Sequence, residues 1–174
     1  MSNYSLFTDG DASLNNTLLV REPDGAMRPA QRAEILSVAR ELVSVDEVRG
    51  QRLDQPSKVK DFLKLRLTGL EHEVCGLILL DSQNQLVQYL EPFRGTVGQA
   101  AVYPREIVKL ALQFNAAAVI MVHNHPSGNT VASLADIQLT KTVRQALALV
   151  DLRLFDHLIV AGAQVISMAE TGDL

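Results

Sequence analysis

Hydrophobic and polar positions along the chain follow two different periods, and these periods predict where helices and strands form. Between residues 29 and 48 the apolar side chains of Ile35, Val38 and Leu42 recur at helical spacing, which predicts an amphipathic helix. The preceding residues 1–28 are polar and rich in turn-forming residues, so we expect a loosely ordered tail there.

Three further segments have the helical pattern, and two of them carry a clear start or stop signal. Ser57 can cap a helix over 58–70, which Gly69 can end. The segment 104–115 begins with a proline, which suits the first position of a helix. A long amphipathic pattern over 133–150 predicts the third helix.

Shorter apolar runs predict the strands of one sheet. Residues 116–123, AAAVIMVH, are almost continuously apolar, as in a central strand that is buried on both faces. Four more strands are expected at 73–81, 86–93, 152–162 and 164–170. Because strands and helices are mixed along the chain, the predicted class is α/β or α+β with a single central sheet.

Composition narrows the class and the expected location of the protein. The 174 residues are 47% hydrophobic and 21% charged, which suits one domain with a real core and a short extension. No apolar run is long enough to cross a bilayer, and the first residues lack a secretory signal pattern, so we expect a cytoplasmic protein. Cys75 is the single cysteine, which excludes an intrachain disulfide and a cysteine-based zinc site.

The charge of the chain bears on nucleic-acid binding. The formal net charge of −4 disfavours a dedicated nucleic-acid binder, because such proteins usually present a basic surface. Basic residues do gather between Arg40 and Arg66, but acidic residues interrupt them. We expect a solvated surface of mixed charge there, and a DNA-binding patch is the weaker alternative.

The candidate chemistry lies in residues 121–136, MVHNHPSGNTVASLAD. His123 and His125 follow an apolar strand and are two residues apart, so both imidazoles can point to the same side of an extended chain. Ser133 begins the next helix, and Asp136 lies one turn further on the same face. If the loop between them folds back, Asp136 can reach the same point as the two histidines.

Two neutral imidazoles and one carboxylate form a recognised catalytic zinc set, which leaves one position open for a water molecule. A hydrolase also needs a proton shuttle and a group that stabilises the oxyanion. Ser133, close to Asp136, suits the second role. For the shuttle we favour Glu73, because it opens an apolar strand. The other upstream candidates are Glu71, Glu91 and Glu106.

Each of these residues also has a purely structural interpretation. The pattern S-x-x-D is frequent at helix N-termini, where Ser133 would cap the helix and Asp136 would lie in its first turn. Glu73 would otherwise be a surface carboxylate at a strand end. Cys75 is expected to be a small core residue, and His157 is expected to pack with one hydrogen bond satisfied.

The spacing H-x-H-x7-S-x2-D, from His123 to Asp136, matches the signature of JAMM (JAB/MPN-fold) metalloproteins. One branch of these, the bacterial RadC-like proteins, is similar to this chain over about residues 57–172. The matching segments are EVCGLILLDSQNQL, FRGTV, VYPREIVKLALQFNAAAVIMVHNHPSG and ALALVDLRLFDHLIVAG. Residues 1–56 show no helix-hairpin-helix module, so the chain resembles the short forms found in prophage and mobile-element regions.

The resemblance implies a fold and a division of the chain. The fold is a curved mixed β-sheet flanked by helices, similar in outline to cytidine deaminase. The RadC-like JAB/MPN domain would cover 57–174, after an N-terminal tail and helical extension at 1–56. Two positions depart from the family pattern, because Ala132 stands where proline is frequent and Cys75 stands where an aromatic residue is frequent.

The resemblance also implies roles for five residues. It implies His123, His125 and Asp136 as zinc ligands. It implies Ser133 as the residue that steadies the tetrahedral intermediate and Glu73 as the general acid and base. The implied activity is metal-assisted hydrolysis of an amide, often an isopeptide bond, in a protein or peptide substrate. The alternatives are a metal-containing binding module without catalysis and an accessory protein of DNA repair.

Overall fold

The part of the chain that the computed structural model describes is residues 17–42, 56–95 and 102–174. The chain divides into two compact units, Met1–Val43 and Ser44–Leu174, and each is described by itself. The domain boundary predicted at residues 56 and 57 lies beside residues 43–55, which are outside the described part, and it stays a prediction.

A small antiparallel hairpin and a helix make up the described part of the first unit. Its elements are β1 (Leu19–Arg21), β2 (Met27–Pro29) and α1 (Arg32–Leu42). The guanidinium of Arg28 donates hydrogen bonds to the carboxylates of Glu22, just after β1, and of Glu34 in α1. One arginine on β2 therefore ties the turn of the hairpin to the first turn of the helix.

The expectation of a loosely ordered tail over 1–28 is wrong for its last part, where the hairpin forms. Its turn is closed by hydrogen bonds from the Glu22 N–H to the Ala26 carbonyl, at 2.8 Å, and from the Gly25 N–H to the Glu22 carbonyl, at 2.9 Å. Gly25 has a φ of 90°, which a residue without Cβ adopts at no steric cost. Local turn chemistry thus orders a segment whose composition is polar.

The helix predicted over 29–48 begins later than expected. Pro29 is still part of β2, and α1 begins at Arg32. Helix α1 is described as far as Leu42, and the predicted residues 43–48 lie outside the described part of the chain.

A five-stranded mixed sheet forms the centre of the second unit, with the strand order β4-β3-β5-β6-β7. Strands β5 and β6 are parallel, and the other neighbours are antiparallel. The strands are β3 (Val74–Leu80), β4 (Leu86–Arg94), β5 (Ala118–His125), β6 (Arg153–Ala161) and β7 (Gln164–Ser167). All five expected strands are present, and β5 is the central one, as predicted.

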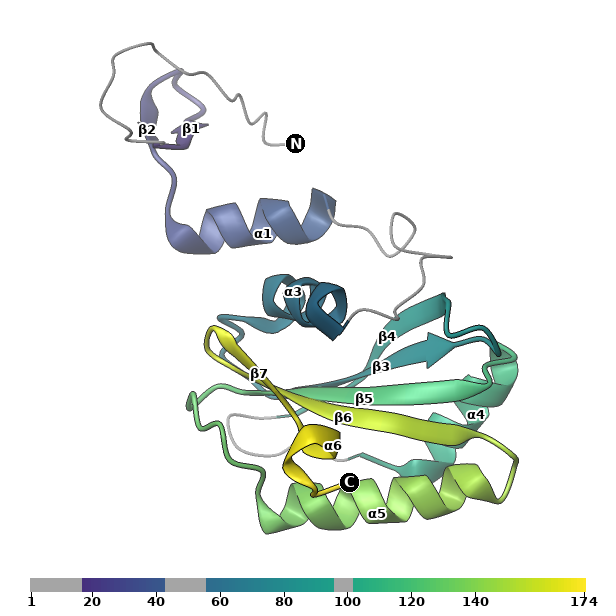
Figure 1. The fold of residues 1–174 in the computed structure, drawn as a ribbon. Coiled ribbons are helices and arrows are strands. Elements are labelled where there is room, and N and C mark those ends of the chain that lie inside the picture. Colours follow the sequence, from purple (N-terminus) through teal and green to yellow (C-terminus); the bar gives the residue numbers. More distant parts are fainter. Residues whose placement is uncertain (1–16, 43–55, 96–101) are drawn as a thin grey trace. The chain divides into compact units, whose positions relative to one another are not determined.

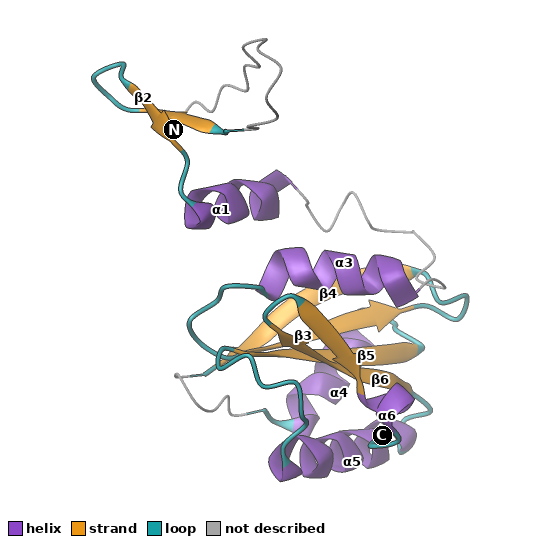
Figure 2. Ribbon diagram, turned by 60° about the vertical axis from the view of Figure 1, so that its left-hand side comes forward, coloured by secondary structure: helices purple, strands orange, loops and turns teal. Residues whose placement is uncertain are grey.

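Helices cover both faces of this sheet. They are α3 (Pro56–Leu67), α4 (Pro104–Gln113), α5 (Leu134–Ala148) and the short α6 (Met168–Thr171). Helix α3 lies on one face, and α4 and α5 lie on the other (Figures 1 and 2). The predicted class, a mixed α/β fold with helices flanking a mixed sheet, is confirmed.

The alternation of side chains along β3 divides the core between the two faces. All seven residues of β3 are buried. Ile78 packs in one cluster with Leu63 of α3. Its neighbour Leu77 packs in the other cluster with Ile107 of α4 and Leu147 of α5. Because successive side chains of a strand point to opposite faces, one strand serves both cores.

Several element ends differ from the prediction, three of them in informative ways. Strand β5 continues to His125, which pairs with Ala161 of β6, so it ends two residues later than the predicted end at His123. Helix α3 begins at Pro56, so Ser57 lies in its first turn and not at its cap. The strand expected over 164–170 ends at Ser167.

That last strand ends early because a helix cap competes with the sheet. The hydroxyl of Ser167 accepts a hydrogen bond from the Glu170 N–H at 3.1 Å, which starts α6. Gly172, with a φ of 85°, ends this helix in the left-handed conformation. The S-x-x-E pattern is a capping signal that outweighs the apolar run before it.

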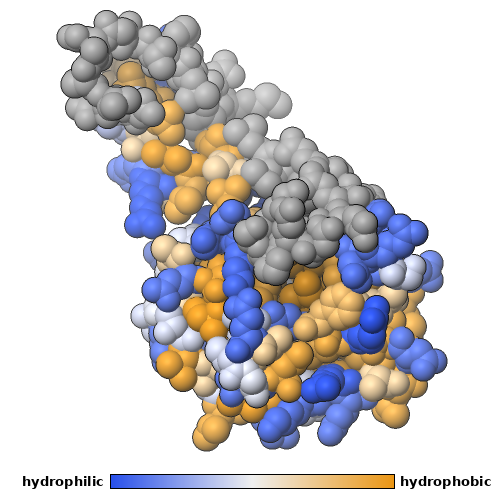
Figure 3. All heavy atoms as spheres, viewed as in Figure 1, coloured by the Kyte–Doolittle hydropathy of each residue, from blue (hydrophilic) through white to orange (hydrophobic). Residues whose placement is uncertain are grey.

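Charged side chains on α3 are paired with acidic partners. Lys60 contacts Glu170 at 3.1 Å, and Arg66 contacts Glu91 at 3.7 Å. Hydrophilic and apolar residues of the described part are interspersed on the face drawn in Figure 3. Within residues 17–42, 56–95 and 102–174, no helix has the length and apolar character that a membrane span needs.

The tight packing around Gly76 of β3 gives a first test. A Cβ at this position would lie 3.0 Å from Val122 Cγ1, 3.1 Å from the Tyr89 hydroxyl and 3.2 Å from the Leu90 carbonyl. We expect Gly76→Ala to lower the free energy of unfolding by about 1–3 kcal/mol, because the backbone oxygen cannot move aside without disturbing the sheet. Urea denaturation measures this, and an unchanged midpoint would contradict the packing described here.

Candidate metal centre

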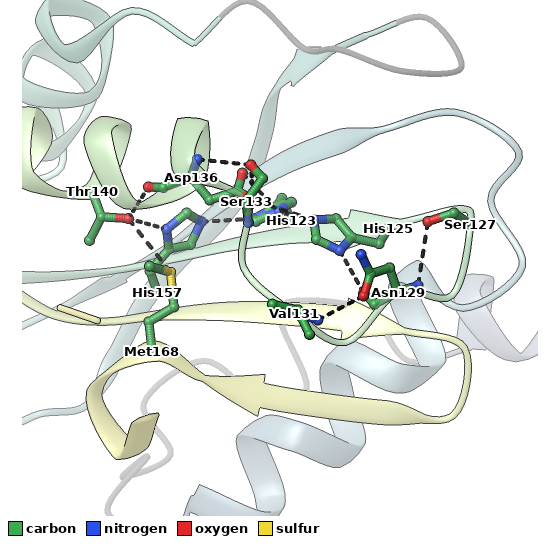
Figure 4. Close-up of polar contacts among 10 residues, drawn as sticks. All are labelled: His123, His125, Ser127, Asn129, Val131, Ser133, Asp136, Thr140, His157 and Met168. Atoms are coloured by element: carbon green, nitrogen blue, oxygen red, sulfur yellow. Dashed lines mark hydrogen bonds and ion pairs between the residues drawn. The ribbon is translucent and has the colours of Figure 1, made fainter. Parts of the chain in front are cut away.

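Two histidines on one face of β5 begin the candidate site. His123 and His125 are two residues apart in the strand, so their rings lie on the same side, and the ring centroids are 4.7 Å apart. Their Nε2 atoms approach each other to 2.8 Å. Figure 4 shows both rings beside the start of α5, as the spacing in the sequence predicts.

Asp136 reaches the same point from the first turn of α5. Its Oδ1 lies 3.3 Å from His123 Nε2, and its Oδ2 lies 3.6 Å from His125 Nε2. The loop between β5 and α5 therefore folds back as required. Ligand atoms of the three residues all lie within 4.8 Å of one another, so the cluster can hold a metal ion.

Ser133 fixes the carboxylate of Asp136 through a capping box. The Asp136 N–H donates to Ser133 Oγ at 3.1 Å, which caps the helix as the S-x-x-D pattern predicts. In return, the Ser133 N–H and hydroxyl donate to Asp136 Oδ2 at 2.7 and 2.6 Å. Burial alone would raise the pKa of Asp136, but His123 and the hydrogen bonds from Ser133 bring it below its usual value.

The electrostatics of the cluster suit metal binding. Burial lowers the pKa of His123 to about 4, against the opposing effect of Asp136. At neutral pH the ring is therefore neutral while Asp136 is ionised. Neutral imidazole and ionised carboxylate are the forms that donate electron pairs to a metal.

A cavity of about 480 Å³ opens beside the cluster. Glu73 and Ser133 line it together with His123, His125 and Asp136. Its walls include the apolar side chains of Val102, Val131 and Leu139. The cavity therefore brings all five predicted site residues to one place.

The register of the sheet explains why Glu73 reaches this cavity. Cys75 of β3 pairs with His123 of antiparallel β5. Glu73 is two residues before Cys75, and His125 is two residues after His123, so continuing the register brings Glu73 level with His125. The other three glutamates considered from the sequence do not line the cavity. They are Glu71, Glu91 and Glu106.

Asn124 is a site residue that the sequence analysis missed. Its buried side chain accepts a hydrogen bond from the Val74 N–H at 2.7 Å and donates one to the His72 carbonyl at 3.0 Å. These two backbone groups flank Glu73 directly. Asn124 thus holds the chain on both sides of the glutamate, and its place between two histidines was the available signal.

Two further predictions concern buried residues near the cluster. Cys75 is 2% exposed, and burial raises the pKa of its thiol to about 12, which agrees with the expected core role. His157 is fully buried, but both of its ring nitrogens have partners, whereas one satisfied hydrogen bond was expected. These partners are His123, at 2.8 Å, and Thr140, at 2.6 Å.

The fold and the cluster together define a JAB-type domain, and comparison with known proteins identifies the branch. A model of the RadC-like JAB domain matches residues 53–173. A UPF0758 protein of Methylibium petroleiphilum is 48% identical over 147 residues, which are 83% of this chain and 66% of that protein. A UPF0758 protein of Vibrio cholerae is 48% identical over 142 residues, which are 82% of this chain and 90% of that protein.

The chain therefore belongs to the RadC-like JAB domain family, as the motifs predicted. It spans 66% of the length of the Methylibium petroleiphilum relative and of a similar protein from Polaromonas, which is 46% identical. The more specific likeness to short prophage forms stays an expectation.

Removal of the Asn124 amide tests its contacts with the backbone around Glu73. We expect Asn124→Ala to lower the free energy of unfolding by about 1–3 kcal/mol, because a buried N–H and a part-buried carbonyl lose their partners. Asn124→Asp keeps one acceptor oxygen for the Val74 N–H but places another oxygen against the His72 carbonyl, so it should also destabilise. Thermal unfolding measures both variants, and wild-type stability in both would show that these hydrogen bonds are unimportant.

Proposed function

We propose that this chain is a zinc-dependent hydrolase of the JAMM type, which cleaves an amide bond in a peptide or protein, such as an isopeptide bond. Three acceptor atoms converge at the wall of the cavity, from His123, His125 and Asp136, and this convergence carries the proposal. Family membership supports it, because the fold is that of a RadC-like JAB domain.

The donor set fits zinc. The ligand atoms of a tetrahedral zinc ion lie about 2.0 Å from the metal and hence about 3.3 Å from one another. The separations among His123 Nε2, His125 Nε2 and the Asp136 carboxylate are 2.8, 3.3 and 3.6 Å, which bracket that value. Three protein ligands of this kind are typical of catalytic zinc sites, which keep a fourth position open.

The orientation of His125 supports the same assignment. Its Nδ1 lies 2.6 Å from the Asn129 carbonyl oxygen, which can only accept a hydrogen bond. In the neutral form of the ring the hydrogen is therefore on Nδ1, and Nε2 directs a lone pair at the cluster. A zinc ion held there would supply positive charge and lower the pKa of a bound water toward neutrality.

Glu73 is the group we assign to proton transfer. It lines the cavity, and Asn124 holds the backbone on both sides of it. A carboxylate in this place would accept a proton from the attacking water and pass it to the leaving amine. Two steps of the hydrolysis would then use one residue.

Ser133 is the group we assign to the developing oxyanion. Its hydroxyl hydrogen is directed to Asp136 Oδ2, and its backbone N–H is directed to the same oxygen. When the hydroxyl turns toward a substrate, the N–H still holds the carboxylate. The serine can therefore donate to the oxyanion without releasing Asp136.

Metal content is the first test. We expect about one zinc per purified chain, and loss of that zinc in the double variant His123→Ala/His125→Ala, because two of three ligands are removed. His72→Ala is the matched control, since its side chain is not part of the cluster, and it should keep the metal. Elemental analysis measures this, and a folded wild type that stays metal-free with added zinc would refute the proposal.

Hydrolysis by a glutamate variant is the second test. We expect Glu73→Gln to retain zinc but to lose activity on peptide and isopeptide libraries by a factor of about 10²–10⁴, because proton transfer is removed. Glu71→Gln is the control for the loss of a nearby carboxylate and should stay active. Full activity of Glu73→Gln would assign the proton transfer elsewhere. Zinc binding without hydrolysis of any substrate in the wild type would favour a metal-containing binding module.

A further inference from the structure

A series of short polar contacts runs from the backbone of α5 to the cluster of His123, His125 and Asp136 (Figure 4). Thr140 Oγ1 lies 2.6 Å from the Asp136 carbonyl oxygen and 2.6 Å from His157 Nδ1. His157 Nε2 in turn lies 2.8 Å from His123 Nδ1. The side chains of Thr140, His157 and His123 are all buried, so water does not compete for these contacts.

The number of available hydrogens determines which group donates at each of these contacts. A carbonyl oxygen can only accept, so the single hydroxyl hydrogen of Thr140 goes to Asp136. Thr140 Oγ1 must then accept from His157, which places the hydrogen of that neutral ring on Nδ1. His157 Nε2 accepts as a result, and His123 must donate from Nδ1. The remaining nitrogen of His123, Nε2, is left with a lone pair at the cluster.

The opposite order leaves a contact without a hydrogen. If Thr140 donated to His157, two oxygen atoms would face each other at 2.6 Å with no hydrogen between them. The sulfur of Met168, at 3.7 Å, is a weak acceptor, and donation to it would leave the same unfavourable pair. The chosen order leaves the Nε2 lone pairs of His123 and His125 facing each other at 2.8 Å, a contact that a cation held between them would satisfy. In the opposite order, His123 would carry its hydrogen on Nε2, where a metal has to bind.

We propose that Thr140 and His157 are positioning residues that hold His123 in the tautomer with its hydrogen on Nδ1, so that Nε2 is free to bind a metal ion. The proposal rests on the proposed metal site and adds two residues that are not among its three proposed ligands. It gives the fully buried His157 a reason to be polar, because an apolar residue at that place has no acceptor for His123.

The two ligand histidines are then set in the same tautomer by different means. Asn129 does this for His125 through a backbone carbonyl, whereas His123 depends on the side chains of His157 and Thr140. A change in Thr140 should therefore alter His123 and leave His125 as it is. This difference provides a control inside the same molecule.

Two variants of Thr140 test this series of hydrogen bonds from Thr140 through His157 to His123, which we call the relay. Thr140→Val has almost the same shape but offers no acceptor to His157, so His157 should move its hydrogen to Nε2 and donate to His123. Thr140→Ser keeps the hydroxyl. Nitrogen-15 NMR of histidine-labelled, metal-free protein at neutral pH reports the tautomer of each ring. Zinc affinity is measured beside it by competition with a chelator.

The expected outcome differs between the two variants. In wild type and Thr140→Ser, His123 should carry its hydrogen on Nδ1. In Thr140→Val, His123 should shift toward the Nε2 form while His125 does not, and zinc affinity should fall by about 10- to 100-fold. An Nε2 hydrogen on His123 in the wild type, or an unchanged tautomer and affinity in Thr140→Val, would overturn the proposal.

Variants of His157 separate its acceptor from its bulk. His157→Gln places an amide oxygen near the position of Nε2 and should keep zinc affinity within a few-fold of wild type. His157→Phe fills the space without an acceptor and should weaken zinc binding like Thr140→Val. Equal affinities in both variants would contradict the assigned role. If either variant fails to fold, the Thr140 pair decides the question.

The NMR measurement also separates this proposal from the proposed function. The tautomers are read in the metal-free protein, so they do not depend on zinc or on activity. A chain that binds no zinc would refute the proposed function whatever the tautomers are. A chain that binds zinc while His123 carries its hydrogen on Nε2 in the metal-free form would refute the relay alone.

Discussion

The position of β5 in the middle of the sheet is the constraint on which the rest of the site depends. His123 is paired on one side with Cys75 of β3 and on the other with Ile159 of β6. A strand held on both sides has little freedom to shift, because a slip of one residue would turn its apolar side chains to the wrong face. The two imidazoles at its end therefore have a fixed place, and the cavity forms around them.

Because β5 is buried, its polar side chains need hydrogen-bond partners on neighbouring parts of the protein. A buried polar ring without partners is costly, so His123, Asn124 and His157 each need acceptors and donors within the protein. Asn124 finds them on the backbone beside Glu73, and His123 finds one on His157. The hydrogen bonds that offset the burial of these polar groups are thus the same ones that orient the site residues.

At the start of α5, two residues likewise serve both the fold and the site. Ser133 and Asp136 form a capping box that stabilises the first turn of the helix, and the carboxylate of this box faces the histidines. The structural interpretation and the metal-site interpretation of S-x-x-D are therefore both compatible with one geometry. A carboxylate held by two hydrogen bonds loses little conformational entropy when it binds a cation, which favours a pre-organised site.

What the sequence alone determined is local. Residues two apart in a strand and three apart at a helix start share a face through backbone geometry, so spacing predicted that His123 lies beside His125 and Ser133 beside Asp136. The meeting of these two pairs depends on how the loop between them folds. The pattern of helices and strands determined the fold class in the same way. The tertiary structure decided what depends on distant partners. Asn124 bonds to backbone 50 residues away, and His157 meets His123 across 34 residues, so only strand pairing reveals them. The cap at Ser167 that ends β7 is a local signal. Whether this cap or the apolar run before it prevails is decided by packing in the folded protein, which residue spacing does not reveal.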